Sequence, residues 1–257
     1  MKSEDSELRA AALPMLASVE AEEAVAMVPA LIAEGELEER RAATQLLAGL
    51  ATDGAAVVLG EQLERHLAGE WPKELQLDLM QAAENYAEHP ACAAPLDKIR
   101  NARSSVDKAL ARHLDSLYGG EVKKGQNLFY YDARLQCLRC HGAWKGDKEK
   151  VGPDLVGVSK RLERREILEA ICLPNASIAE GYETTALFRD GGGVVAGRIV
   201  FEDEDLVRVQ VSSGELVEVS TKEIRSRRPD LSSMPEGLAD LIDREQMRDL
   251  IAFLAQL

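Results

Sequence analysis

Hydrophobic side chains recur at helical spacing through the first 118 residues of this chain of 257 residues. In five segments they lie three or four residues apart, which is the spacing of one face of an amphipathic helix. Polar or glycine-containing breaks at Glu34 and Gly35, Asp53 and Gly54, Gly69 and Glu70, and His89 and Pro90 keep the segments short. Residues 1–118 are therefore predicted to form a domain of short α-helices. The predicted apolar faces are Leu8, Ala12, Met15, Leu16 and Val19; Val25, Val28, Leu31 and Ile32; Ala43, Leu46, Leu47 and Leu50; Leu75, Leu79, Ala82 and Tyr86; and Val106, Leu110, Leu114 and Leu117.

The hydrophobic period changes from 3.6 to 2 between residues 182 and 228. Alternating positions at 184–189 are followed by apolar runs at 194–201, 206–211 and 216–219. Turn-forming residues at 190–193, 202–205 and 212–215 separate them, as in β-hairpins. Four short antiparallel strands are predicted here, forming a small curved sheet or barrel.

The helical segments before residue 118 resemble HEAT-type repeats, in which each antiparallel helix pair buries its apolar face only against neighbouring pairs. The internal period is irregular, and no diagnostic repeat motif is present. Tyr118, Gly119 and Gly120 mark the natural domain boundary, because glycine commonly ends a helix. The expected domains are therefore 1–118 and 119–257, with the β-rich insert at about 182–228 inside the second.

Cys137, Cys140 and His141 form a C-x-x-C-H run, the attachment signature of a c-type haem. The two thiols can each add to one haem vinyl group, and the adjacent imidazole then lies beneath the iron. A C-x-x-C pair also occurs in thioredoxin-like sites and as half of a zinc site. A thioredoxin motif follows a buried strand, whereas the segment before Cys137 has a helical pattern. A second ligand pair for zinc is not visible, because the other cysteines, Cys92 and Cys172, are isolated.

Further motifs flank this run in a fixed order. Together they resemble a class I cytochrome c. Over about residues 121–257 the chain is similar to the haem c domain family found at the C-termini of large planctomycete and verrucomicrobial proteins. The positions that carry the resemblance are Gly125, Leu128 and Phe129; Cys137, Cys140 and His141; Gly152, Pro153 and Leu155; Pro174; Gly181 and Tyr182; and Met234, Pro235, Gly237 and Leu238. The resemblance implies a cytochrome c fold that carries the β insert and binds one haem covalently through Cys137 and Cys140.

The resemblance also implies the ligands and supporting residues of the iron. His141 would be the proximal ligand, with the Pro153 carbonyl accepting from its other ring nitrogen and Leu155 belonging to the same haem-binding motif. Met234 would be the distal ligand, and a methionine in a loop of serines and proline is poorly explained as core. Met247 is the competing thioether, but it shares a helical apolar stripe with Leu250, Ile251 and Leu254. An open or His-ligated iron remains the other alternative.

Three other features of the sequence bear on the haem hypothesis. Arg225, Arg227 and Arg228 either pair with a haem propionate or end a solvated strand. Trp144 is expected to cover the haem edge. His113 lies on an apolar helix face and is expected to be an interfacial histidine rather than a second ligand.

Charge and composition limit the classes of partner that the chain is expected to bind. The chain has a formal net charge of −14, and residues 1–118 contain 11 Lys and Arg against 21 Asp and Glu. An acidic surface repels phosphates, so nucleic acid is disfavoured as a partner. No stretch approaches the roughly 20 apolar residues of a membrane span. Cys92 and Cys172 are expected to be buried thiols.

The expected cellular location follows from where this kind of cofactor is attached. Haem attachment of this kind takes place outside the cytoplasm, so the protein is expected to be periplasmic or otherwise exported. The segment Met1 to Glu7 lacks the apolar region of a signal peptide. The chain is therefore expected to be part of a larger exported protein.

The expected function is electron transfer rather than catalysis, because two axial protein ligands leave no open position on the iron. Electrons would arrive from a fused or separate dehydrogenase and leave to another redox partner. Two alternatives remain: a haem sensor or peroxidase-like domain with a labile sixth ligand, and an interaction scaffold with a structural haem.

Overall fold

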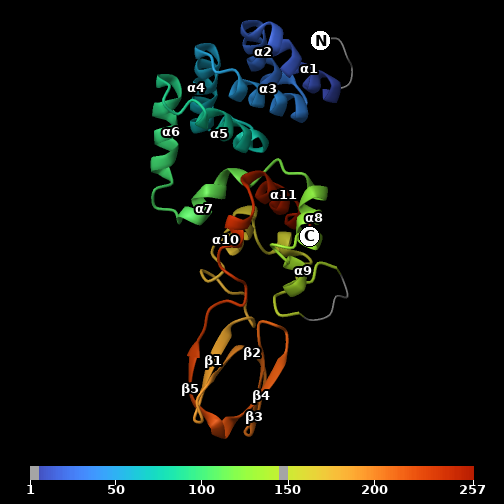
Figure 1. Ribbon diagram of the computed structural model, residues 1–257, viewed down its shortest axis with the longest axis vertical. Coiled ribbons are helices and arrows are strands. Elements are labelled where there is room, and N and C mark those ends of the chain that lie inside the picture. Colours follow the sequence, from blue (N-terminus) through green and yellow to red (C-terminus); the bar gives the residue numbers. More distant parts are fainter. Residues whose placement is uncertain (1–5, 145–149) are drawn as a thin grey trace. The chain divides into compact units, whose positions relative to one another are not determined.

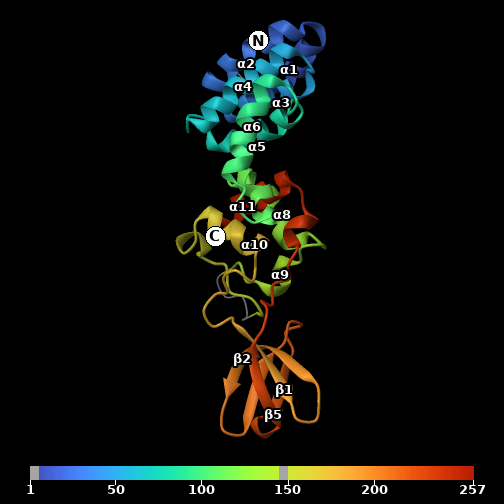
Figure 2. The same cartoon turned by 90° about the vertical axis from the view of Figure 1, so that its left-hand side faces the viewer.

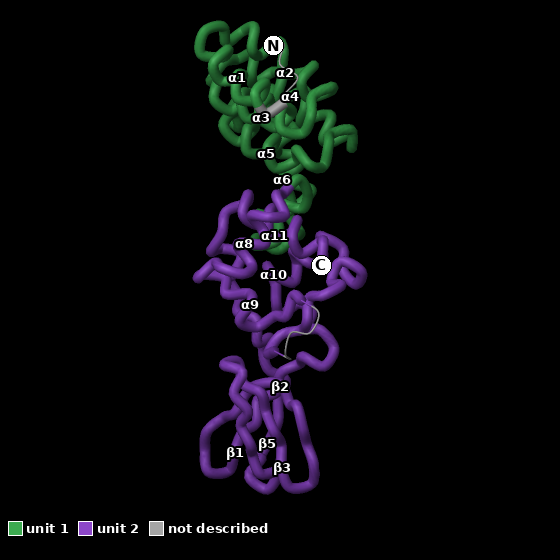
Figure 3. The backbone as a smooth tube through the Cα atoms, turned by 90° about the vertical axis from the view of Figure 1, so that its right-hand side faces the viewer, with its two compact units in different colours: residues 1–119 green, residues 120–257 purple. Residues whose placement is uncertain are grey.

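The computed structural model describes residues 6–144 and 150–257. The chain divides into two compact units, residues 1–119 and 120–257, next to the glycine pair at which the sequence places a boundary (Figure 3). Residues 1–5, on which the expectation of a missing signal peptide mainly rests, lie outside the described residues. Among the residues described, no helix has both the length and the apolar character needed to cross a bilayer.

The first unit is entirely helical over its described residues. Several of its helices begin at side chains that cap free backbone N–H groups: the Thr52 hydroxyl accepts from the Ala55 N–H, and Glu36 and Glu39 form a reciprocal capping box. The predicted break at Asp53 and Gly54 lies slightly too late, because this cap starts a helix at Asp53. The elements are α1 (Ser6–Val19), α2 (Ala21–Glu34), α3 (Leu37–Gly49), α4 (Asp53–Leu67), the 3-10 turn η1 (Lys73–Leu75), α5 (Gln76–Glu84), α6 (Pro90–Ala102), α7 (Lys108–His113) and η2 (Leu114–Ser116).

These helices stack in two layers (Figures 1 and 2). In one layer α1 packs on α3 and α3 on α5, and in the other α2 packs on α4 and α4 on α6. From α1 to α5, each helix also contacts the next one in sequence. Contacts between every second helix are typical of stacked helix pairs, the arrangement on which the HEAT-type expectation rests.

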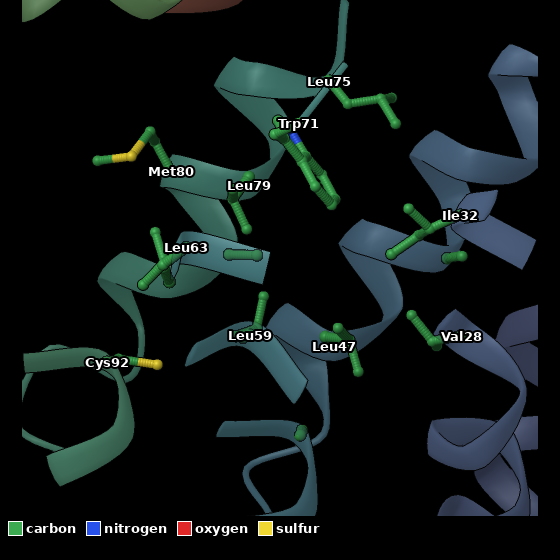
Figure 4. Close-up of a cluster of buried hydrophobic side chains, with 14 of the residues drawn as sticks. Val28, Ile32, Leu47, Leu59, Leu63, Trp71, Leu75, Leu79, Met80 and Cys92 are labelled. Atoms are coloured by element: carbon green, nitrogen blue, oxygen red, sulfur yellow. The ribbon is translucent and has the colours of Figure 1, made fainter. Parts of the chain in front are cut away.

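The core of this unit lies between the two layers (Figure 4). The predicted apolar faces of α2, α3 and α5 supply much of it, including Val28, Ile32, Leu47 and Leu79, each at most 2% exposed. This part of the periodicity prediction is confirmed.

The prediction of which face of α1 is buried is wrong. Leu8, Met15 and Val19 are 62%, 72% and 79% exposed, whereas Leu13 is fully buried. Among the described residues the helix packs mainly on α2 and α3, which cover one narrow face. That face is centred on Leu13, which the stripe of larger apolar residues did not include.

The second unit contains a set of helices around the C-x-x-C-H run. Helices α8 (Val122–Tyr131) and α11 (Arg244–Leu254) pack closely, and Gly125 lies where they meet. Asp243 and Gln246 form the capping box that starts α11. The remaining elements are α9 (Cys137–Cys140), η3 (Val158–Lys160), α10 (Arg164–Cys172) and η5 (Leu238–Leu241).

The β-rich insert is a five-stranded antiparallel sheet rather than the four strands predicted. The strands are β1 (Thr184–Arg189), β2 (Val194–Glu202), β3 (Leu206–Gln210), β4 (Leu216–Ser220) and β5 (Ile224–Pro229), in the order β4-β3-β2-β1-β5, with the turn η4 (Thr221–Glu223) before β5. The three predicted turns are confirmed. Strand β5 was missed because its sequence is mostly polar and does not alternate, and its residues are exposed except Ile224. Leu187, Val207, Val209 and Val219 form the core of the sheet.

Candidate functional site

The two thiols of the C-x-x-C-H run lie on one helical turn, α9. Gln136 enters this turn with a left-handed backbone (φ 49°), and its side-chain amide donates to the Ala133 carbonyl. The His141 N–H donates to the Cys137 carbonyl at 2.9 Å and closes the turn. Cys137, Cys140 and His141 are therefore held in one compact segment.

A polar turn fixes the approach to α9. The Asp132 carboxylate accepts from the backbone N–H groups of Arg134 and Leu135 and from the Arg134 guanidinium. The guanidinium is the main reason that the pKa of Asp132 falls from 3.8 to about 2, with the two N–H groups adding to the effect and burial opposing it. Arg134 also donates to the Leu241 carbonyl, which ties this turn to η5.

The segment from Lys150 to Leu155 covers the C-terminal end of α9. The Gly152 N–H donates to the Cys140 carbonyl and the Leu155 N–H to the Gly142 carbonyl, at 2.8 and 2.9 Å. The Lys150 ammonium donates to the carbonyls of Leu138 (2.6 Å) and His141 (3.1 Å). These donors satisfy carbonyl groups that a helix end leaves without partners, and a cation is favoured at that end.

His141 is oriented by the same segment. Its Nδ1 lies 2.9 Å from the Pro153 carbonyl oxygen, so the expected contact between these residues is present. A carbonyl only accepts, so Nδ1 carries the proton and the lone pair is on Nε2. Burial lowers the pKa of His141 and outweighs the opposing effect of the Pro153 carbonyl, which keeps the ring neutral. A Cβ atom on Gly152 would lie 2.7 Å from the His141 Cε1, so only glycine fits beneath the ring.

The Cys137 thiol is not activated as a nucleophilic thiolate. Burial raises the pKa of Cys137 to about 11, so its thiol is protonated at neutral pH. The described cysteines form no disulfide, and Cys92 and Cys172 are buried as expected.

Met234 lies in a second loop, which follows β5. It is partly exposed, and its N–H donates to the Ser232 hydroxyl at 3.2 Å. The Ser232 N–H in turn donates to the Asn175 side-chain oxygen at 2.7 Å. Met247 is fully buried in α11 with Leu250 and Ile251, so its assignment to the helix core is confirmed.

The structure also places the arginine, tryptophan and histidine side chains that the sequence analysis considered in relation to the haem. The guanidinium of Arg227, in β5, donates twice to the carboxylate of Glu202 at the end of β2, at 2.7 and 2.9 Å. This contact favours the strand interpretation for Arg227. Trp144 is 57% exposed and stacks on Tyr130, with ring centroids 6.1 Å apart. His113 is fully buried in the first unit.

Sequence reasoning missed two residues that shape the site, Lys150 and Asn175. Each is a single polar residue in a loop, and no periodicity or spacing distinguishes it from its neighbours. Only the path of the folded chain brings their side chains to the carbonyls around His141 and to the loop of Met234.

The donor set fits a c-type haem. A haem iron requires one or two axial protein ligands, and a neutral imidazole with a free Nε2 beside two thiols on one turn meets that need. Among the described residues, no group of three or more His, Cys, Asp or Glu side chains is arranged to bind a metal ion directly.

Comparison with known proteins adds no relative. No protein-family model matches the chain. A search of curated proteins likewise finds no significant match.

Proposed function

We propose that residues 119–257 form a single-haem c-type cytochrome domain that transfers electrons. The observation that carries the proposal is the geometry of His141, which presents a neutral imidazole with Nδ1 held by Pro153 directly after two thiols on one turn. When bound, the haem would supply an iron centre that gains and loses one electron.

Cys137 and Cys140 would anchor the group. Each thiol adds across one vinyl double bond, so that sulfur bonds to one carbon and the thiol hydrogen goes to the other. The addition releases nothing and needs no oxidant. A fixed turn suits this reaction, because it holds the two sulfur atoms at one spacing. The Cys137 thiol carries the hydrogen that the addition requires.

His141 and Met234 would be the axial ligands. The contact with Pro153 fixes the imidazole plane and makes Nε2 a better donor. A thioether stabilises ferrous over ferric iron and raises the reduction potential above that of a bis-His centre. With both axial positions filled by protein, the domain would carry electrons without binding a substrate, so we do not propose an enzyme.

The first unit would serve as a HEAT-like helical scaffold for this domain. The proposed partners are a dehydrogenase, fused or separate, as donor and another redox protein as acceptor. The acidity of residues 1–118 argues against nucleic acid. Because haem attachment occurs outside the cytoplasm, we propose a periplasmic or otherwise exported location.

Optical spectra of the haem-loaded protein test this function. We expect reversible one-electron reduction by an external donor and a weak near-infrared methionine-to-iron band in the oxidised state. Met234→Ala should abolish the band and lower the potential, whereas the matched control Met247→Ala should leave the band in place. Rapid binding of cyanide or CO by the unmodified protein would instead favour a sensor or peroxidase, and failure of any donor to reduce it would favour a structural haem.

A further inference from the structure

Asn175 lies three residues after the end of α10, just beyond Pro174, and its side chain reaches the loop of Met234. We propose that Asn175 is the positioning residue of this loop and controls how firmly Met234 is held toward the iron. This inference rests on the proposed function, and it assigns a role to a residue for which the sequence suggests none.

The side-chain amide of Asn175 contacts the loop on both sides of Met234. Its Oδ1 accepts from the Ser232 N–H at 2.7 Å, and its Nδ2 donates to the Glu236 carboxylate. Ser232 lies two residues before Met234 and Glu236 two residues after it. One amide therefore closes the loop into a short bridged segment with the methionine at its centre.

The two partners also fix the orientation of the amide. A backbone N–H requires an acceptor and a carboxylate requires a donor, so the oxygen faces Ser232 and the nitrogen faces Glu236. Aspartate would keep the first contact but bring two carboxylates together. Leucine, with a similar volume, would lose both contacts.

The loop has a second anchor at its N-terminal side. The Thr184 hydroxyl at the start of β1 donates to the Leu231 carbonyl, and the Asp230 N–H donates to the Thr184 carbonyl at 3.0 Å. Within the loop, the Met234 N–H donates to the Ser232 hydroxyl. These contacts fix the entry to the loop, while the amide of Asn175 also reaches its exit at Glu236.

This arrangement has a consequence for ligation. A thioether is a weak ligand of ferric iron, so its occupancy depends on how well the loop is preorganised. Loosening the loop should increase the fraction of time that the sixth position is open. Each neutral hydrogen bond lost should change that fraction about threefold to tenfold.

Cyanide binding to the oxidised, haem-loaded protein measures this opening. Asn175→Leu should bind cyanide about threefold to tenfold or more faster than the unmodified protein, with a weaker near-infrared band and a lower potential. Glu236→Gln is the matched control, because its side-chain oxygen still accepts from Asn175 Nδ2, and its rate should stay within about twofold.

A rescue variant separates positioning from general destabilisation. Asn175→Asp should accelerate cyanide binding by placing two carboxylates together. Adding Glu236→Gln should restore a slow rate, because the new amide donates to the aspartate while the Ser232 contact is kept. Far-UV circular dichroism should show the same helix content in all four variants. If Asn175→Leu does not bind haem, the proposal is tested by comparing Asn175→Asp with the double variant Asn175→Asp, Glu236→Gln.

Failure of the role of Asn175 can be distinguished from failure of the proposed function. A band and slow cyanide binding in the unmodified protein, unchanged in Asn175→Leu and in Asn175→Asp, would overturn the role of Asn175 and leave Met234 ligation intact. A band that is absent from the unmodified protein would overturn Met234 ligation and the role of Asn175 with it.

Discussion

The crossing of α8 and α11 gives the sharpest stability prediction, because Gly125 leaves no room for a side chain. A Cβ atom at this position would lie 1.9 Å from the Asp249 carbonyl oxygen, 2.5 Å from its carbonyl carbon and 2.9 Å from the Phe253 Cβ. Ordinary contacts of a Cβ atom begin near 3.4 Å. Gly125→Ala would therefore require the two helices to separate by about 1.5 Å, the difference between 3.4 and 1.9 Å.

The cost of that separation exceeds the gain in helix propensity. The two nearest obstructing atoms are backbone, and a Cβ atom such as that of Phe253 cannot rotate away either. Overpacking of this kind costs about 1 to 3 kcal/mol or more. The shift would also weaken the hydrogen bond from the Glu121 N–H to the Asp249 carboxylate, which is 2.7 Å long. Replacing glycine inside a helix returns about 1 kcal/mol. A contact of 1.9 Å with backbone puts the cost at the upper end of that range, about 3 kcal/mol. We therefore expect a net loss of about 2 kcal/mol in the free energy of unfolding of the second unit.

Denaturant unfolding of the haem-loaded protein, followed by haem absorbance, measures this loss. Gly191→Ala is the matched control, because a Cβ at Gly191 meets no atom within 4 Å, and its midpoint should not change. A midpoint for Gly125→Ala equal to that of the control would refute the close packing of α8 on α11.

Three further predictions follow from individual contacts. Because Arg134 lowers the folded-state pKa of Asp132 to about 2, below its usual 3.8, this carboxylate stabilises the fold above about pH 4 and loses that effect as the pH falls toward 2. Asp132→Asn should therefore flatten the difference in stability between pH 5 and pH 2 in acid titrations followed by circular dichroism, and an unchanged profile would contradict it. Met247→Ala should destabilise the protein by about 2 to 5 kcal/mol, because a fully buried methionine leaves a cavity, without changing the spin state seen by optical spectroscopy. Residues 1–119, expressed alone, should show helical circular dichroism and cooperative unfolding, because their core is complete within this unit; an unfolded fragment would refute that independence.

Much of the fold was predictable because hydrophobic periodicity reports burial. It located most helices of the first unit, the hairpin turns of the sheet and the core position of Met247. It gave no apolar face for α4 and α6, although Leu59, Leu63 and Leu96 of these helices are fully buried. It failed for α1, where a stripe of large apolar residues is exposed and the buried face is centred on Leu13. It also failed for β5, whose strand is held by backbone pairing with β1 and has no alternating apolar face.

The candidate site was predictable only where the motif spacing is short. Cys137, Cys140 and His141 lie within five residues. The contact of His141 with Pro153, twelve positions later, is the one that the resemblance to class I cytochromes c implies. The supporting roles of Lys150 and Asn175 depend on where separate loops meet in three dimensions. A single polar residue in a loop has no sequence pattern that specifies its partner.

The most direct test of the central claim is the intact mass of the denatured protein after co-expression with a periplasmic haem-attachment system. Covalent attachment through Cys137 and Cys140 predicts a mass increase equal to one haem, retained after acid-acetone extraction. The Cys137→Ala, Cys140→Ala double variant should show no such increase, while a Cys92→Ala, Cys172→Ala control should retain it. A protein that gains no haem, or a double variant that still carries one covalently, would contradict the assignment of this site.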